Sequence, residues 1–187
     1  MKIVMHPTEI DLFSEFLAYT SSYYEFGMGG STCLAAKMVK DRVHAIDSDP
    51  AWVENVRNEI GSPTKDIQMS VVNIGPTGGW GTPIGRDHEH LFPDYSLSIT
   101  RTGFTDYDFC LVDGRFRVAC FLQALSILPA DAVIAIHDYL SRPQYHLVEQ
   151  FARPIAGKGQ LRLFVRRHGA DMGAVATMLE TYRRNPE

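Results

Sequence analysis

The first residues that could do chemistry form a glycine-rich stretch, EFGMGGST, at residues 25–32. Gly27 and Gly29 would let the backbone approach a ligand closely and would permit a positive φ. A helix starting directly after them would aim its unpaired N–H groups at the same place. Asp47 lies 20 residues after Gly27, a spacing at which a carboxylate of the next strand can accept hydrogen bonds from ribose hydroxyls. These residues predict a pocket for an adenosine-containing ligand.

The third glycine position and Glu25 distinguish between two such ligands. A dinucleotide fingerprint, GxGxxG, needs a third glycine where this sequence has Thr32. Glu25 places a carboxylate just before the turn, which would oppose a pyrophosphate and suit the cationic methionine end of S-adenosylmethionine (SAM). The sequence therefore favours SAM over a nicotinamide dinucleotide.

Two carboxylates and a histidine form a second candidate group. Asp113 ends the apolar segment 107–113, and His137 and Asp138 end the apolar segment 132–138. Ligands of a doubly wound sheet bind beyond the carboxyl ends of its strands, so all three are candidate catalytic residues. His137 could deprotonate an acceptor hydroxyl or amine as a general base, or it could be a strand-end histidine satisfied by hydrogen bonds.

Arg115, Arg117 and Trp80 each leave two interpretations open. The arginines could bind a carboxylate or phosphate of the acceptor bidentately, or they could be surface charges at the start of a helix. Trp80 lies in the long Gly- and Pro-rich segment 75–93, and such loops are often lids. Its ring could close over adenine or an acceptor ring, or it could anchor the loop. The candidate substrate-binding residues are Trp80, Arg115 and Tyr139.

Short apolar runs alternate with helical periodicity along the chain, which predicts βαβ units. Asp49 followed by Pro50 predicts a helix start, Gly61 predicts its end, and Ser31 or Thr32 could cap the preceding helix. Four strands are near-continuous apolar runs, as expected where helices cover both faces. We therefore predict an α/β fold with three layers, α/β/α, around a doubly wound, mostly parallel sheet. The expected strands are 23–27, 43–47, 67–74, 107–113, 132–138 and 161–167, and the expected helices start after Pro7 and then cover 31–41, 50–61, 116–128, 144–151 and 173–183.

The stretch E-x-G-x-G-G-S-T, followed by AIDSDP at the end of the next strand, resembles the SAM-binding motifs of class I (Rossmann-like) methyltransferases. The resemblance implies that Glu25 and the glycines line the methionine and ribose region and that Asp47 holds the ribose. In that family a polar residue after the third strand meets the adenine amine. Asn73 is at the matching position, where it could also be a simple turn residue. The implied cofactor-binding residues are Glu25, Gly27, Gly29, Gly30, Asp47, Asn73 and Asp113.

Residues 112–139 resemble the region of the fourth and fifth strands in small-molecule O-methyltransferases. In several of those enzymes, carboxylates at the two strand ends bind a divalent cation, and Asp113 and Asp138 are at the matching positions. This sequence has Arg115, Phe116 and Arg117 after the Asp-Gly pair and lacks the His and Tyr of that pattern. Oxygen ligands suit Mg²⁺, but two neighbouring guanidinium groups would oppose a cation. A divalent metal is therefore possible but not favoured, and no residue is assigned to a metal.

Length and composition exclude several classes of protein. A chain of 187 residues predicts a single domain, residues 1–187, and 45% hydrophobic with 21% charged residues is typical of globular proteins. A formal net charge of -4 provides no cationic field for general nucleic-acid binding. No stretch resembles a secretory signal or approaches the ~20 apolar residues of a membrane helix, so we expect a cytoplasmic location and no membrane partner. The three cysteines, Cys33, Cys110 and Cys120, are expected to be buried thiols.

These observations predict a SAM-dependent methyltransferase that transfers a methyl group to a small-molecule acceptor, with oxygen preferred over nitrogen. A second hypothesis is a catalytically inactive module that binds SAM or S-adenosylhomocysteine (SAH), which the altered residues after Asp113 favour. A third, a nicotinamide-dependent oxidoreductase, is disfavoured by Thr32 and by the lack of a YxxxK pair. The identity of the acceptor and the oligomeric state, including a homodimer, stay open.

Overall fold

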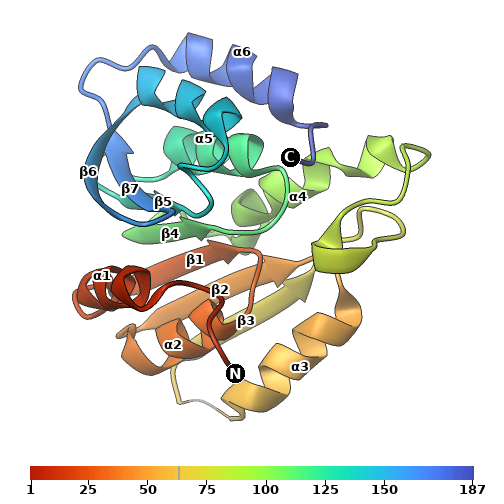
Figure 1. The fold of residues 1–187 in the computed structure, drawn as a ribbon, viewed down its shortest axis with the longest axis vertical. Coiled ribbons are helices and arrows are strands. Elements are labelled where there is room, and N and C mark those ends of the chain that lie inside the picture. The colour runs from red at the N-terminus through yellow and green to blue at the C-terminus, as the bar shows by residue number, and fades with distance from the viewer. Residues whose placement is uncertain (63) are drawn as a thin grey trace.

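A sheet of seven strands runs through the middle of the protein, with helices on both of its faces (Figure 1). The computed structural model describes residues 1–62 and 64–187. The order across the sheet is β3-β2-β1-β4-β5-β7-β6, with β1 to β5 parallel and β7 antiparallel to β5. This arrangement confirms the predicted doubly wound fold. The strands are β1 (Ser22–Phe26), β2 (Arg42–Asp47), β3 (Asp66–Val71), β4 (Phe109–Val112), β5 (Val133–Ile136), β6 (Ala152–Lys158) and β7 (Leu161–Arg166).

The helices form two layers, and successive strand residues alternate between them. Tyr23 packs in the cluster that contains Phe13 of the first helix, whereas its neighbour Tyr24 packs with Phe121 on the opposite face. This period of two in a sheet covered on both sides explains why central strands such as β4 and β5 are continuous apolar runs. One layer holds α1 (Pro7–Leu17), α2 (Gly30–Met38) and α3 (Pro50–Ile60), and the other holds α4 (Pro93–Leu97), α5 (Arg117–Ile127) and α6 (Met172–Tyr182).

Local signals explain where α1 and α3 begin. The side chain of Asp49 accepts hydrogen bonds from the N–H groups of Ala51 and Trp52, and Pro50 is the first helical residue, as predicted. Gly61 ends α3 with a φ of +74°. In α1, the His6 side chain accepts from the Thr8 N–H, and the Glu9 carboxylate accepts from the His6 N–H.

The predicted cap of α2 is wrong. Ser31 and Thr32 lie inside the first turn, after Gly29 at the N-cap position, and both hydroxyls donate to the Glu25 carboxyl group. Thr32 Oγ1 also accepts from the Gly29 N–H at 2.9 Å. The two hydroxyls therefore join the end of β1 to the start of α2.

The sequence analysis missed β6 and misjudged the segment before it. β6 contains Pro154 and Gly157 and has an irregularity between Pro154 and Ala156, features that an edge strand tolerates and that weaken a strand signal. The helix predicted over 144–151 is instead a run of 3₁₀ turns at Pro143–Gln150. The long segment 75–93 contains short 3₁₀ turns at 79–81 and 89–91. A third turn, at 98–102, directly follows α4.

All three cysteines are buried free thiols, as expected. Among the residues that the structure describes, no helix is both long and apolar enough to cross a lipid bilayer.

Candidate functional site

A cavity of about 680 Å³ lies beyond the carboxyl ends of β1, β2, β4 and β5. Its walls come from the turn after β1, the end of β2, the turn after β4 and the end of β5. The N-terminal residues 2–4 and the loop residues 80–82 also line it. The cavity is therefore where a doubly wound parallel sheet places its ligands.

Three glycines of the turn after β1 line this cavity, and a side chain at each position would meet a different neighbour. Gly27 has a φ of +90°, and a Cβ there would lie 2.3 Å from the Gly114 Cα, so the turns after β1 and β4 pack backbone against backbone. A Cβ on Gly30 would lie 2.5 Å from the Lys2 carbonyl oxygen, so this glycine makes room for the N-terminal segment. A Cβ on Gly29 would meet only Trp52, at 3.8 Å. Gly29 is thus the glycine that leaves space for a ligand.

Glu25 supports this turn from below and does not line the cavity. It is fully buried, and its two oxygens accept from the Ser31 and Thr32 hydroxyls. Burial raises the pKa of Glu25 to about 8, against the opposing effect of these hydrogen bonds. Its position fits a role in holding the first turn of α2 and gives it no direct path to a ligand.

Asp47 ends β2 and lines the cavity, as the sequence predicts. Its Oδ1 accepts from the N–H groups of Ser48 at 2.7 Å and Asp49 at 3.1 Å, which fixes the carboxylate. Burial raises its pKa. Trp52, which the sequence analysis missed, lines the same cavity next to Gly29 and donates its indole N–H to the Met28 carbonyl at 2.7 Å. Its position in the first turn of a helix carries no local signal of such a role.

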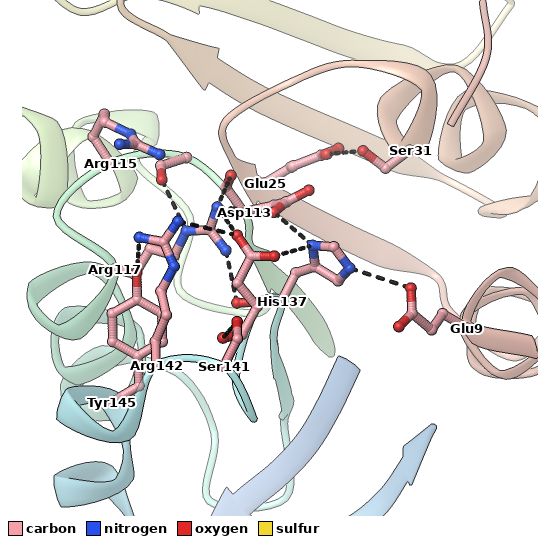
Figure 2. Close-up of polar contacts among 12 residues, drawn as sticks. Glu9, Glu25, Ser31, Asp113, Arg115, Arg117, His137, Ser141, Arg142 and Tyr145 are labelled. Atoms are coloured by element: carbon pink, nitrogen blue, oxygen red, sulfur yellow. Dashed lines mark hydrogen bonds and ion pairs between the residues drawn. The ribbon is translucent and has the colours of Figure 1, made fainter. Parts of the chain in front are cut away.

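At the opposite side of the cavity, charged side chains form a strand-end cluster of Asp113, Arg117, His137 and Asp138 (Figure 2). The His137 Nδ1 lies 3.2 Å from Asp113 Oδ1 and 3.6 Å from Asp138 Oδ1. The Arg117 Nη2 lies 3.2 Å from Asp113 Oδ1 and 3.1 Å from Asp138 Oδ2. The three predicted catalytic residues therefore lie in contact, held together by one arginine.

Glu9 of α1 completes the surroundings of His137, and the sequence analysis missed it. The Glu9 Oε2 lies 3.3 Å from His137 Nε2, while Oε1 accepts from the Gln160 N–H at 2.6 Å. Burial opposes a charge on His137, but the hydrogen bond and charge of Asp113, with Asp138 and Glu9, outweigh it and raise the pKa of His137. Both ring nitrogens face carboxylates, so the surroundings favour the imidazolium form.

The cluster does not fit a divalent cation, although its ligand types would suit one. One ligand atom each of Asp113, His137 and Asp138 lie within 4.8 Å of one another. Arg117 already pairs with both carboxylates from a position 4% exposed to solvent. A metal ion would have to displace this buried guanidinium and the proton of His137.

Asp138 adopts a left-handed backbone conformation, with φ of +59°, and Phe116 does so at +53°. Such conformations are unfavourable for residues other than glycine and occur preferentially at functional sites. Here they bend the chain directly after β5 and directly before α5. The bends bring Asp138 and Arg117 to the same end of the sheet.

Two other predicted contacts lie away from the cavity. The Tyr139 side chain is buried, and its hydroxyl donates to Glu149 Oε1 at 2.6 Å. Asn73 is exposed, and its Oδ1 accepts from the Gly75 N–H at 3.0 Å, a turn contact. Neither side chain lines the cavity, so the structure gives both a local structural role.

Trp80 lies at the mouth of the cavity, at the tip of a small hairpin formed by residues 77–83 (the Trp80 hairpin). Thr77 bridges Pro83, and the Gly78 N–H donates to the Thr82 carbonyl at 2.8 Å. The Trp80 side chain is 83% exposed. It does not anchor the loop in the core, so the second interpretation of this residue is wrong.

Comparison with known proteins points to one group. No family model matches the sequence, and no curated protein matches it. A methyltransferase-like protein from Silicibacter pomeroyi shares 30% identity over 97% of both chains, with a TM-score of 0.87. An O-methyltransferase from Bacillus cereus in complex with SAH shares 13% identity over 87% of this chain and 82% of its own, with a TM-score of 0.58. An N-methyltransferase from Bradyrhizobium japonicum in complex with SAH shares 12% identity over 88% and 90%, with a TM-score of 0.54.

Proposed function

The chain belongs to the methyltransferase-like proteins with the class I SAM-dependent methyltransferase fold, and from this we propose that it transfers a methyl group from SAM to a small-molecule acceptor. We propose oxygen over nitrogen as the accepting atom because residues 112–139 resemble the small-molecule O-methyltransferases. One observation carries the proposal: Gly29, with open space beside it, and the fixed carboxylate of Asp47 line the same cavity.

We assign the binding of SAM to the donor end of the cavity, formed by Gly27, Gly29, Asp47 and Trp52. Gly29 leaves room for the methionine end, and Asp47 would accept hydrogen bonds from the ribose hydroxyls. The unpaired N–H groups at the start of α2 add donors beside Gly29. Glu25 supports this end from below through α2, and Gly30, also at the cavity wall, makes room for the N-terminal segment.

The acceptor end consists of the strand-end cluster and Arg115. SAM would supply a methyl group on a good leaving group, so alignment of the acceptor provides much of the acceleration. We assign the acceptor's proton to the pair of Asp113 and His137, because Asp113 Oδ1 and His137 Nδ1 lie 3.2 Å apart at the cavity. Asp113 is the more exposed member, with 24% of its side chain accessible. Asp138, fixed by Arg117, faces the same ring nitrogen as Asp113, and Glu9 holds the imidazole from the other side.

A second candidate function is binding of SAM or SAH without turnover. The observation that favours it is Arg117, which engages both carboxylates of the proposed acceptor end. Activity separates the two functions, because an active enzyme releases SAH when hydroxylated small molecules are supplied. Tight binding with no SAH release over a broad panel would favour the binding module.

Calorimetric titration of the protein with SAM, SAH and NAD⁺ tests the proposal. We expect binding of SAM and SAH and no binding of NAD⁺. Asp47→Ala should weaken SAH binding by about 1–3 kcal/mol, because hydroxyl contacts to a carboxylate are lost. Asp11→Ala removes an exposed carboxylate of α1 and serves as the control that should leave affinity unchanged. Equal SAH affinity for all three proteins would overturn the assignment of the donor end.

A further inference from the structure

Arg115 is a cation without a counter-charge at the acceptor end of the cavity. Its side chain lines the cavity, and its Nε is buried with no hydrogen-bond partner in the described part of the chain. The Nη1 donates to the Thr82 hydroxyl over 3.3 Å, a long contact. Within residues 1–62 and 64–187, no carboxylate oxygen lies within 4.0 Å of its guanidinium. Such a group retains donor capacity for an anion.

Arg117, two residues further on, also lines the cavity but differs from Arg115 in its hydrogen bonds and ion pairs. Its Nε donates to the Gly114 carbonyl at 3.0 Å, its Nη1 to the His137 carbonyl at 2.6 Å, and its Nη2 to the Asp113 carbonyl at 2.9 Å. It also pairs with the carboxylates of Asp113 and Asp138. Each of its three nitrogens already donates to a group at the ends of β4 and β5, so Arg117 serves to join these strand ends.

Arg142 supplies a second guanidinium to the same cavity (Figure 2). Its Nη2 lies 3.6 Å from Asp138 Oδ2, and its Nη1 donates to the Tyr145 hydroxyl at 3.3 Å. Both contacts are long, so the charge of Arg142 is only partly compensated. Burial, with the charges of Arg117 and Arg142, lowers the pKa of Arg115, which means that a negative charge placed here would relieve an unfavourable arrangement.

We propose that the acceptor carries an anionic group, a carboxylate or a phosphate, that binds to Arg115 with Arg142 as a second contact. This inference rests on the proposed function, because it assigns a chemical class to the acceptor in the same cavity. A planar guanidinium binds either group through paired hydrogen bonds, which fixes orientation as well as affinity. Bound in this way, the acceptor would lie beside Asp113, two residues before Arg115.

The proposal also gives the Trp80 hairpin a part in acceptor binding. Thr82 is the neutral partner of Arg115, and Gly81 next to it lies against the donor end, where a Cβ would be 2.9 Å from Ser48 Oγ. An anion at Arg115 would compete with the Thr82 hydroxyl for the same donor. The hairpin therefore touches both ends of the cavity.

Arginine side-chain NMR tests this inference without knowledge of the whole acceptor. The ¹⁵N-labelled protein, with and without SAH, is titrated with sodium acetate, inorganic phosphate and neutral acetamide at constant ionic strength. We expect the Arg115 Nε–H signal, assigned by its loss in Arg115→Gln, to shift saturably with acetate or phosphate and not with acetamide. The anion that binds more tightly, acetate or phosphate, indicates whether the acceptor's anionic group is a carboxylate or a phosphate. Arg142→Gln should weaken this response on the order of 10-fold, as expected for one charge-assisted hydrogen bond.

Arg153→Gln is the control, because Arg153 is an exposed arginine of β6 outside the cavity, and it should leave the titration unchanged. An Arg115 signal that responds to neither anion, or equally to acetamide, overturns the inference. Calorimetry with SAH on the same samples reports separately on the donor end. If the Arg115 signal responds to an anion in a protein that does not bind SAH, the proposed function is contradicted but the anion site is supported.

Discussion

The two ends of the cavity are built on different physical principles. The donor end is formed mainly by backbone, namely three glycines and the start of α2. One fixed carboxylate, Asp47, and the Trp52 ring complete it. At the acceptor end, charged side chains from distant parts of the chain neutralise one another, and Arg115 is left over. The donor end thus depends on the absence of a side chain at Gly29. The acceptor end depends on which charged side chains form ion pairs and which do not.

Arg117→Met should produce the largest effect, because it removes the charge that joins the two carboxylates of the acceptor end. Breaking a buried ion pair leaves its partners unpaired, and we expect a loss of about 3 kcal/mol in the free energy of unfolding. Urea denaturation measures the loss, with Arg153→Met as the control. A change below about 0.5 kcal/mol, within the range of ordinary surface substitutions, would mean that the carboxylates are not held by this arginine.

Gly29→Val tests whether the donor end depends on empty space. Gly29 has an extended φ of 177° and only Trp52 near its Cβ position, so valine should fold normally and project into the ligand's space. We expect SAH affinity to fall by at least about 100-fold, or about 2.7 kcal/mol. Gly29→Ala is the graded control and should lose less. If calorimetry gives the same SAH affinity for the valine variant and the unchanged protein, the ligand binds elsewhere.

The sequence predicted residues at the cavity most accurately where their position depends on the local backbone. The turn at residues 25–32 and the carboxylate of Asp47 could be predicted because glycine and strand-end signals are local. Glu9 could not, because it lies 128 residues from His137 and its contact depends on how α1 packs. β6 was missed because an edge strand with Pro154 and Gly157 has little pattern. Arg115 and Arg117 look alike in the sequence, and only their partners separate them.

Glu9→Gln sharpens the difference between the ends by removing one carboxylate from His137. The folded state raises the pKa of His137 above 6.5, so its protonation stabilises the protein fully below the unfolded pKa, and this contribution is lost as the pH rises through the folded pKa. The variant should lower the pKa of His137, measured by NMR titration. It should also lose about 1 kcal/mol of stability at pH 5 and less at pH 9. A pKa that does not move would show that Glu9 has no electrostatic effect on the histidine.

Removal of divalent metal should have the smallest effect. Because Arg117 already pairs with both Asp113 and Asp138, treatment with EDTA should change neither SAH affinity nor the unfolding temperature. Added Mg²⁺ or Mn²⁺ should likewise shift neither quantity by linkage, since a ligand raises stability only where it binds the folded state. A rise in the unfolding temperature with millimolar Mn²⁺, abolished in Asp113→Asn, would show that the strand-end cluster binds a divalent cation.

A crystal structure of the protein grown with excess SAH would show directly whether the cavity is the SAM site. We predict the ligand in the cavity, with its homocysteine part beside Gly29, its ribose hydroxyls at the Asp47 carboxylate, and its sulfur facing Asp113. An SAH molecule bound at another place, or a cavity filled by the protein's own residues 2–4 or Trp80 in the presence of saturating SAH, would contradict it.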